Sequence, residues 1–176
     1  MRWLRSYCSA VDALSTWVGS LLRFVVLALV VLGVVNVLTR YIGAHLGMAL
    51  SSNAVLESQT QAFNLIFLLG AAWLLRIDGH IRVDIVRTRL SERLRIWTDV
   101  LGNALLLLPF CALMLLYTWP FVTRAWSRLE VSPNPGGLPL YPIKTVLLIA
   151  FVLIALQTLS EIIKGIDRLR ELRTWK

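Results

Sequence analysis

The chain has 176 residues, of which 57% are hydrophobic, and it carries a formal net charge of +8. Ordinary soluble domains are only about 45–50% apolar, so this composition indicates a membrane protein. The positive charge does not indicate nucleic-acid binding. The basic residues cluster between apolar runs and at the C-terminus, without the interleaved aromatic side chains on which bases stack. A membrane surface is the partner that this charge fits best.

Four long runs without charged residues separate the basic clusters. They lie between Arg23 and Arg40, Glu57 and Arg76, Asp99 and Arg124, and Lys144 and Glu161. A bilayer core of about 30 Å takes about 20 helical residues, and a snorkelling Arg or Lys can lengthen a short run by about a turn. We therefore expect an all-α membrane protein, one domain over residues 1–176, with four transmembrane helices at about 17–39, 58–76, 100–121 and 144–163.

Lysine and arginine are distributed unevenly over the segments that flank these spans. The N-terminal tail, the segment between spans two and three and the C-terminal tail share one side if there are four spans, and they hold thirteen basic residues. The opposite side holds four, which are Arg40, Arg124, Arg128 and Lys144. Because basic loops stay in the cytoplasm, we predict that both termini are cytoplasmic. No small-residue cleavage pattern follows the first apolar run, so we expect that span to be retained.

The first span is preceded by a basic lead-in and contains a charge. Apolar side chains recur at helical spacing within residues 1–16, so we expect an amphipathic helix lying along the cytoplasmic interface. Arg23 follows about two turns inside span one. It either snorkels to the inner interface or pairs with another charge within the membrane. Glu161, near the cytoplasmic end of span four, has a compatible depth, so an intramembrane Arg23–Glu161 pair is one hypothesis.

Three polar residues share one face of span two, which follows a first external loop over residues 40–57. Glu57, Gln61 and Asn64 are spaced i, i+4 and i+7. Exposing that face to lipid would be costly, so we expect it to point into the bundle or towards a partner. Glu57 and Arg40 lie at the same membrane edge and could pair.

An amphipathic stripe occupies the cytoplasmic segment between spans two and three. Its apolar members are Val83, Val86, Leu90, Leu94 and Trp97. This pattern predicts an interfacial helix on the inner membrane face, and docking to a second protein is the alternative that remains open. The second external loop, residues 124–144, is rich in proline and glycine, so we expect it to be ordered or semi-ordered and not helical. The tail after Glu161 alternates acids and bases and should continue span four as a helix.

The chain lacks the residue clusters that catalysis would require. His45 and His80 fall on opposite sides of the membrane under this topology, so they cannot both ligate one haem. Cys8 and Cys111 are too far apart for a redox motif or a disulfide. We therefore expect a protein that is not an enzyme, with no catalytic, cofactor-binding or metal-binding residues. Because four short spans enclose little volume, an accessory subunit of a larger membrane partner is favoured over a transporter that acts alone.

Three stretches, in a fixed order along the four expected spans, carry a resemblance to a known family. They are Gly70-Ala71-Ala72 in the span headed by Glu57, the stretch from Arg76 through Asp78, Gly79, His80 and Asp84 to Ile85, and Trp126-Ser127-Arg128-Leu129-Glu130-Val131-Ser132 followed by Gly137-Leu138-Pro139-Leu140-Tyr141-Pro142. Over about residues 15–165 the chain resembles the small membrane (Q) subunit of the TRAP (tripartite ATP-independent periplasmic) transporters.

The resemblance implies a role and partners. In this family the small subunit forms a complex with a large permease subunit, which holds the substrate and sodium sites and moves like an elevator. A soluble periplasmic binding protein delivers the substrate, commonly a carboxylate or a sugar acid. The resemblance thus implies a scaffolding subunit for ion-coupled uptake in the bacterial inner membrane, without cofactors. A four-span assembly or signalling protein, or the membrane anchor of an electron-transfer enzyme, remains as an alternative.

The resemblance also implies roles for single residues. Asp78, His80 and Asp84 would cap and orient the turn into the interfacial helix. Arg128, Glu130 and Ser132 belong to the outer-loop stretch, for which contact with the large subunit or the binding protein is the hypothesis.

Overall fold

The computed structural model describes residues 2–48, 52–79 and 90–174. Its elements in chain order are α1 (Arg2–Leu46), α2 (Asn53–Arg76), α4 (Glu92–Gly102), the π-helical turn η1 (Asn103–Leu107), α5 (Leu108–Ser127) and α6 (Tyr141–Thr174). Apart from one isolated bridge, the described residues form helices, turns and loops, which confirms the predicted all-α class. Three helices of the described part are long and apolar enough to cross a membrane: Trp3–Leu46, Glu92–Ser127 and Tyr141–Leu172.

Helix α1 is a single unbroken helix of 45 residues, or roughly 67 Å at 1.5 Å per residue. The expected separate interfacial helix over residues 1–16 is therefore wrong. No glycine or proline precedes Gly19, so nothing interrupts the helix between lead-in and span. The helix also continues past Arg40, where the external loop was expected to begin. It ends at Gly47, which has φ 65°, and the N–H of Met48 donates to the carbonyl of Gly43 at 2.9 Å.

Helix α2 has clear start and stop signals at its two ends. The Ser52 hydroxyl accepts the N–H of Ala54, as expected of an N-cap residue. At the other end Asp78 adopts φ 54°, and the N–H of Gly79 donates to the carbonyl of Leu74 at 3.0 Å. This is a Schellman motif with aspartate in the left-handed position that glycine usually holds. Helix α2 is not among the three candidate spans, because polar side chains fill its first half.

Helices α4, η1 and α5 follow one another without a break. The wide π-helical turn lies directly before Pro109. A proline ring clashes with the carbonyl four residues earlier, and a π-turn is one of the local adjustments that accommodate such a ring. Residues 92–97, the second half of the expected interfacial stripe, therefore begin the same helix that forms the candidate span Glu92–Ser127. Residues 80–89, which hold Val83 and Val86, lie outside the described part of the chain.

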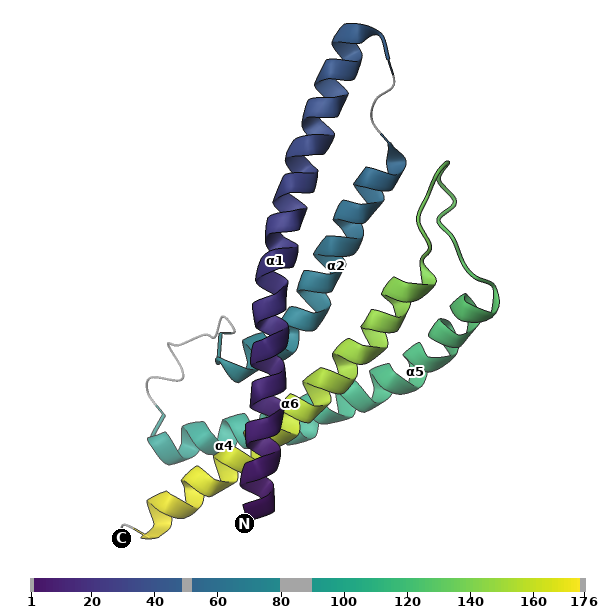
Figure 1. The fold of residues 1–176 in the computed structure, drawn as a ribbon. Coiled ribbons are helices and arrows are strands. Elements are labelled where there is room, and N and C mark those ends of the chain that lie inside the picture. The colour runs from purple at the N-terminus through teal and green to yellow at the C-terminus, as the bar shows by residue number, and fades with distance from the viewer. Residues whose placement is uncertain (1, 49–51, 80–89, 175–176) are drawn as a thin grey trace.

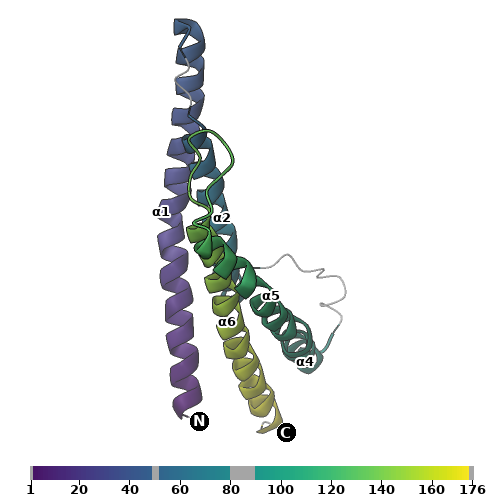
Figure 2. The ribbon, with the colours of Figure 1, turned by 90° about the vertical axis from the view of Figure 1, so that its right-hand side faces the viewer.

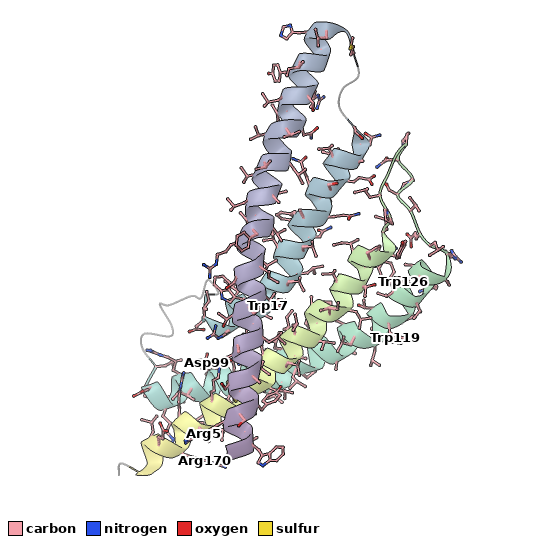
Figure 3. The ribbon with its side chains drawn as sticks, viewed as in Figure 1. Arg5, Trp17, Asp99, Trp119, Trp126 and Arg170 are labelled. Atoms are coloured by element: carbon pink, nitrogen blue, oxygen red, sulfur yellow. The ribbon has the colours of Figure 1, made fainter. Side chains whose placement is uncertain are left out.

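Helix α6 is the centre of the bundle and packs against α1, α2, α4 and α5. The α1–α2 and α5–α6 hairpins cross each other (Figure 1), and α6 lies between α1 and α5 when the molecule is turned by 90° (Figure 2). The ends of the chain lie at one end of the bundle, called here the inner end. The C-terminal end of α1, the N-terminal end of α2 and the loop over residues 128–140 lie at the opposite, outer end. Figure 3 shows Arg5, Asp99 and Arg170 near the inner end and Trp126 near the outer end.

Close approaches of glycine hold neighbouring helices together. A Cβ atom added at Gly19 would lie 2.6 Å from the Trp73 indole, and one added at Gly165 would lie 2.5 Å from a methyl of Val100. Small residues at such positions let membrane helices pack closely. Large apolar side chains point outward instead, as along the upper half of α1 and along α5, where Leu116 is 70% exposed.

Candidate functional site

The carboxylate of Glu57, in the first turns of α2, holds the outer loop over residues 128–140. Its Oε1 accepts hydrogen bonds from the Ser132 hydroxyl and from Nδ2 of Asn134 (2.8 Å), and its Oε2 accepts the backbone N–H of Leu138 (2.6 Å). Two further α2 side chains contact the same loop, since Asn53 and Gln61 each donate to a proline carbonyl, in both cases at 3.2 Å. We call the group formed by Glu57, Ser132, Asn134 and Leu138 the outer clamp.

The outer clamp sets the charge state of Glu57. The Ser132 hydroxyl, the Leu138 N–H and the Asn134 amide all stabilise the carboxylate, so they hold the pKa of Glu57 below its ordinary value of 4.5. A carboxylate that accepts several hydrogen bonds stays ionised over the physiological range. The ionised carboxylate of Glu57 therefore holds the outer loop in place.

The loop is folded upon itself as well as clamped. The N–H of Ser132 donates to the carbonyl of Leu138 at 3.0 Å, and the N–H of Leu140 donates to Glu130 at 2.8 Å. The turn between them needs glycine, because Gly136 has φ 71°. A Cβ atom added at Gly137 would lie 2.5 Å from the Ser132 Cβ. The expected ordered, non-helical loop is confirmed, although it is shorter than residues 124–144.

Polar and aromatic contacts join the two ends of the outer loop. Lys144 forms an ion pair with Glu130 at 2.6 Å, and its Nζ lies 4.2 Å from the ring centre of Phe121. The Trp126 indole N–H donates to the Thr145 hydroxyl at 2.8 Å. The chain turns after α5 in a second Schellman motif, with Leu129 at φ 45° and the Glu130 N–H bonded to Ala125.

The remaining residues expected at the outer end lie apart from the clamp. Arg40 does not pair with Glu57, and its side chain lies beside Val37, Tyr41 and Ala44. Helices α1 and α2 run antiparallel with Asn36 bonded to Gln59 at 3.1 Å, so Arg40 lies only about half a turn beyond the level of Glu57. The Glu57 carboxylate is engaged by the outer loop instead. Arg128 is exposed at the end of α5, and Asn64 is half-buried in α2.

A second polar group joins α1 to α6 near the inner end. Gln157, which is fully buried, accepts from the Ser15 hydroxyl (2.7 Å) and donates to Asp12 and Glu161 (both 3.0 Å). Lys164 pairs with Asp12 at 2.7 Å and with Glu161 at 2.8 Å. These five residues are called here the inner polar cluster, and it satisfies buried polar groups within the bundle.

The hypothesis of an Arg23–Glu161 pair is not supported by this geometry. Glu161 contacts Gln157 and Lys164, while Nη2 of Arg23 donates to the Ser20 hydroxyl at 3.3 Å. Helices α1 and α6 run antiparallel with Ser15 beside Gln157. Arg23 therefore lies about 12 residues, or roughly 18 Å along the bundle, from the level of Glu161. The two side chains are too far apart to meet.

Sequence reasoning missed the inner polar cluster, although a signal for it exists. Gln157, Glu161 and Lys164 are spaced i, i+4 and i+7 on α6, and Asp12 and Ser15 are spaced i and i+3 on α1. Such spacings place side chains on one helix face. Asp12 is also the first acidic residue of the chain, and a long apolar stretch separates it from the next one, Glu57. An isolated acidic residue beside an apolar stretch needs a partner, so the sequence indicates that Asp12 pairs with a basic group.

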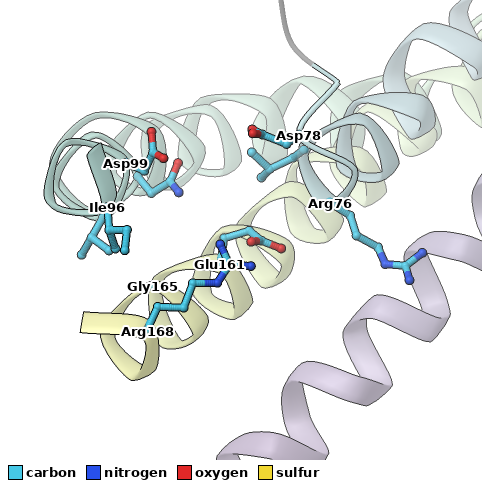
Figure 4. A pocket seen from close by; sticks show the side chains of 10 residues that line it. Arg76, Asp78, Ile96, Asp99, Glu161, Gly165 and Arg168 are labelled. Carbon is cyan, nitrogen blue, oxygen red and sulfur yellow. The ribbon is translucent and has the colours of Figure 1, made fainter. Parts of the chain in front are cut away.

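A polar cavity of about 140 Å³ lies between α2, α4 and α6 at the inner end. Asp78, Asp99, Glu161 and Arg168 point towards it (Figure 4). Arg76 lines its edge, but the guanidinium is turned towards α1, where it donates to the Thr16 hydroxyl. The cavity has room for a few water molecules, and its lining contains both acidic and basic side chains. These features favour a water-filled gap between the helices.

Several expected features fall on other parts of the structure or outside it. His80 and Asp84 lie outside the described residues, and Asp78 forms the turn that ends α2. Cys8 and Cys111 are both buried and free. Within residues 2–48, 52–79 and 90–174, no group of three or more histidine, cysteine, aspartate or glutamate side chains could hold a metal ion.

Comparison with known proteins supplies one match. A family model described as "Tripartite ATP-independent periplasmic transporters, DctQ component" matches residues 29–168. That range includes the whole of α2, α4 and α5, the whole outer loop, most of α6 and the last part of α1, residues 29–46. No curated protein and no solved structure matches the chain.

Proposed function

Since the chain belongs to the family of DctQ components of tripartite ATP-independent periplasmic transporters, in which it is a small permease component, we propose that it serves as a static frame for a large permease subunit. The observation that carries the proposal is the family match, which extends from α1 to α6. The family is one of transporter components and not of enzymes.

The proposed frame crosses the membrane four times, through α1, α2, the α4–η1–α5 helix and α6. Helix α2 has 24 residues, or roughly 36 Å, which is long enough for a bilayer core of about 30 Å. Glu57 lies outside the expected span, at its outer edge, and the polar side chains of Gln59 and Gln61 bond to α1 and to the outer loop, which removes the main cost of placing them in lipid. Both termini lie at the basic end of the bundle, so we propose that this end is cytoplasmic.

The first turns of α4 are proposed to lie at the inner interface. Ser91 caps the helix by accepting the N–H of Leu94 at 3.4 Å. Leu94 and Trp97 are 53% and 44% exposed, while Glu92 and Arg93 are also exposed in the same turns. An apolar side chain next to charged ones suits the headgroup boundary.

The proposed partners meet different surfaces of the frame. The large permease subunit would cover part of the exposed apolar surface of α1 and α5, and lipid would cover the rest. A periplasmic binding protein would meet the outer loop, where Arg128 and Glu130 are exposed or half-exposed. By analogy with the family, the complex would drive ion-coupled uptake of a small organic acid across the bacterial inner membrane by an elevator movement of the large subunit.

Reconstitution tests the division of labour. Liposomes would hold the large permease subunit with this chain, the large subunit alone, or this chain alone, each with the binding protein and an ion gradient. We expect uptake only when both membrane subunits are present. Uptake by this chain alone, or full uptake without it, would contradict the proposed role. Arg128→Ala and Glu130→Ala should lower uptake by the intact complex, while Arg170→Ala at the inner end serves as the exposed control.

Cysteine labelling tests the four-span topology separately. In a variant with serine at the two buried cysteine positions, Cys8 and Cys111, single cysteines replace His45 and Arg170. We expect the probe at position 45 to react with an impermeant reagent in intact cells. The probe at position 170 should react only after the membrane is opened. Equal reactivity of both probes in intact cells would rule out an even number of crossings.

A further inference from the structure

The side chain of Arg23 points along α1 towards the inner end. Its Nη2 donates to the Ser20 hydroxyl at 3.3 Å, and Ser20 lies one turn nearer to the N-terminus. Helical side chains lean in that direction. The side chain is exposed, and the expected partner Glu161 is engaged elsewhere by Lys164. A guanidinium thus lies on the outside of the bundle, within a helix that is apolar enough to span a membrane.

The depth of this guanidinium matches that of lipid headgroups. It lies level with Gly19, which packs on the Trp73 indole. One turn closer to the inner end, Arg76 donates to Thr16. Trp17, on the same part of α1, is 61% exposed. Because tryptophans settle at the membrane–water boundary, the Arg23 guanidinium would lie at or just inside that boundary on the inner side when the bundle is embedded as proposed.

An apolar groove runs from Arg23 between α1 and α2. Its volume is about 560 Å³, within the range of about 300–1,000 Å³ that small-molecule sites occupy. Its walls are formed by Gly19, Leu22, Arg23, Val26, Ile66, Phe67, Gly70, Ala71, Trp73 and Leu74. Arg23 is the one charged residue among these. Small residues widen the groove on the α2 side, and a Cβ added at Gly70 would touch only Leu22, at 3.6 Å.

We propose that this groove binds an acidic glycerophospholipid of the inner leaflet. Its phosphodiester would contact the Arg23 guanidinium, and one acyl chain would lie along Leu22, Val26 and Phe67. A guanidinium binds a phosphate through charge-assisted, bidentate hydrogen bonds. A cation at one end of an apolar channel is complementary to an amphiphile with an anionic head. A partner helix would need an acidic side chain to pair with Arg23, and the test below separates that occupant from a lipid.

The proposal rests on the proposed embedding of α1 and α2 in a bilayer and does not depend on the transport role. The test uses the full chain in phosphatidylcholine nanodiscs that contain a minor fraction of phosphatidylglycerol. Native mass spectrometry then counts the phosphatidylglycerol that the ejected protein retains. We expect Arg23→Gln to lower retention about tenfold, the loss that corresponds to one charge-assisted hydrogen bond, and Arg23→Lys to restore most of it. Gly70→Ile, which keeps the charge and fills the groove, should also lower retention.

Arg40→Gln is the matched control, because Arg40 is another arginine of α1 beside an apolar hollow of about 440 Å³, but that hollow is lined by α1 alone and lies near the outer end. It should leave retention of the lipid unchanged. Equal retention by all variants, or an equal loss with Arg40→Gln, would overturn the proposal. It would also be overturned if Arg23→Gln left retention unchanged but released the large permease subunit, since Arg23 would then face an acidic residue of that subunit. A complex that retains the lipid but shows no uptake would instead refute only the proposed function.

Discussion

Replacing Gln157 by leucine is expected to destabilise the bundle by about 2–4 kcal/mol. The side chain is fully buried and makes three hydrogen bonds, to Ser15, Asp12 and Glu161. Bonds between membrane helices contribute about 0.6 kcal/mol on average and up to about 1.7. The Ser15 hydroxyl, which is 2% exposed, would also lose its acceptor, at a cost of about 1–3 kcal/mol. Lys164 continues to pair with both carboxylates, which keeps the expected total below the sum of these values.

Thr158→Val is the matched control for this substitution. Thr158 is equally buried, but its hydroxyl donates only to the carbonyl of Ile154 in the same helix, at 2.7 Å. The free energy of unfolding would be measured by titration with sodium dodecyl sulfate, followed through tryptophan fluorescence. We expect the control to lose less than about 1 kcal/mol. The reasoning fails if Gln157→Leu unfolds within about 0.5 kcal/mol of the parent chain, or if the two variants are equally destabilised.

Two further substitutions test the close packing and the outer clamp. Gly165→Val should lower the free energy of unfolding by about 1–3 kcal/mol through overpacking, because even a Cβ would lie 2.5 Å from Val100. Gly102→Ala is the control: its Cβ would meet nothing within 4 Å, so it should be neutral or stabilising in the same titration. For Glu57, a lowered pKa means that the clamp is fully formed above pH 4.5 and is lost as the pH falls below that value. Proteolysis within residues 128–140 should therefore stay slow from pH 7 to 5 and accelerate in stronger acid, while Glu57→Gln should be cleaved faster already at pH 7. Cleavage that rises between pH 7 and 5 would show that another group holds the loop.

Apolar runs predicted the existence of the helices much better than their ends. The run from Phe24 to Thr39 indicates one span, but α1 extends for about six turns before it and about two turns after it. A span is limited by the thickness of lipid, whereas a helix ends only where backbone hydrogen bonds find other partners. Gly47 and Asp78 provide such ends through a left-handed residue. Glycine at a helix end is a recognisable signal, but aspartate in that conformation is not.

The polar face of α2 was predictable, but its partner was not. The spacing of Glu57 and Gln61 indicates a shared face, and both side chains contact the outer loop. Whether Glu57 contacts Arg40 or this loop depends on how α1 packs against α2 and on the position of α6. Neither is encoded in the periodicity of a single helix. The same limit explains why Glu161 was assigned to Arg23, since membrane depth alone does not show which of several polar side chains lies nearest.

The distribution of polar contacts also bears on why such a bundle would be rigid. In lipid, apolar side chains gain nothing by leaving the solvent for another helix, so specificity must come from close packing and hydrogen bonds. The inner polar cluster joins α1 to α6 at one end, and the outer clamp joins α2 to the α5–α6 loop at the other. Between them, Gly19 on Trp73 closes α1 against α2. Fixing the two hairpins to each other at both ends opposes their sliding and rotation, which is the mechanical property that a frame for a moving partner requires.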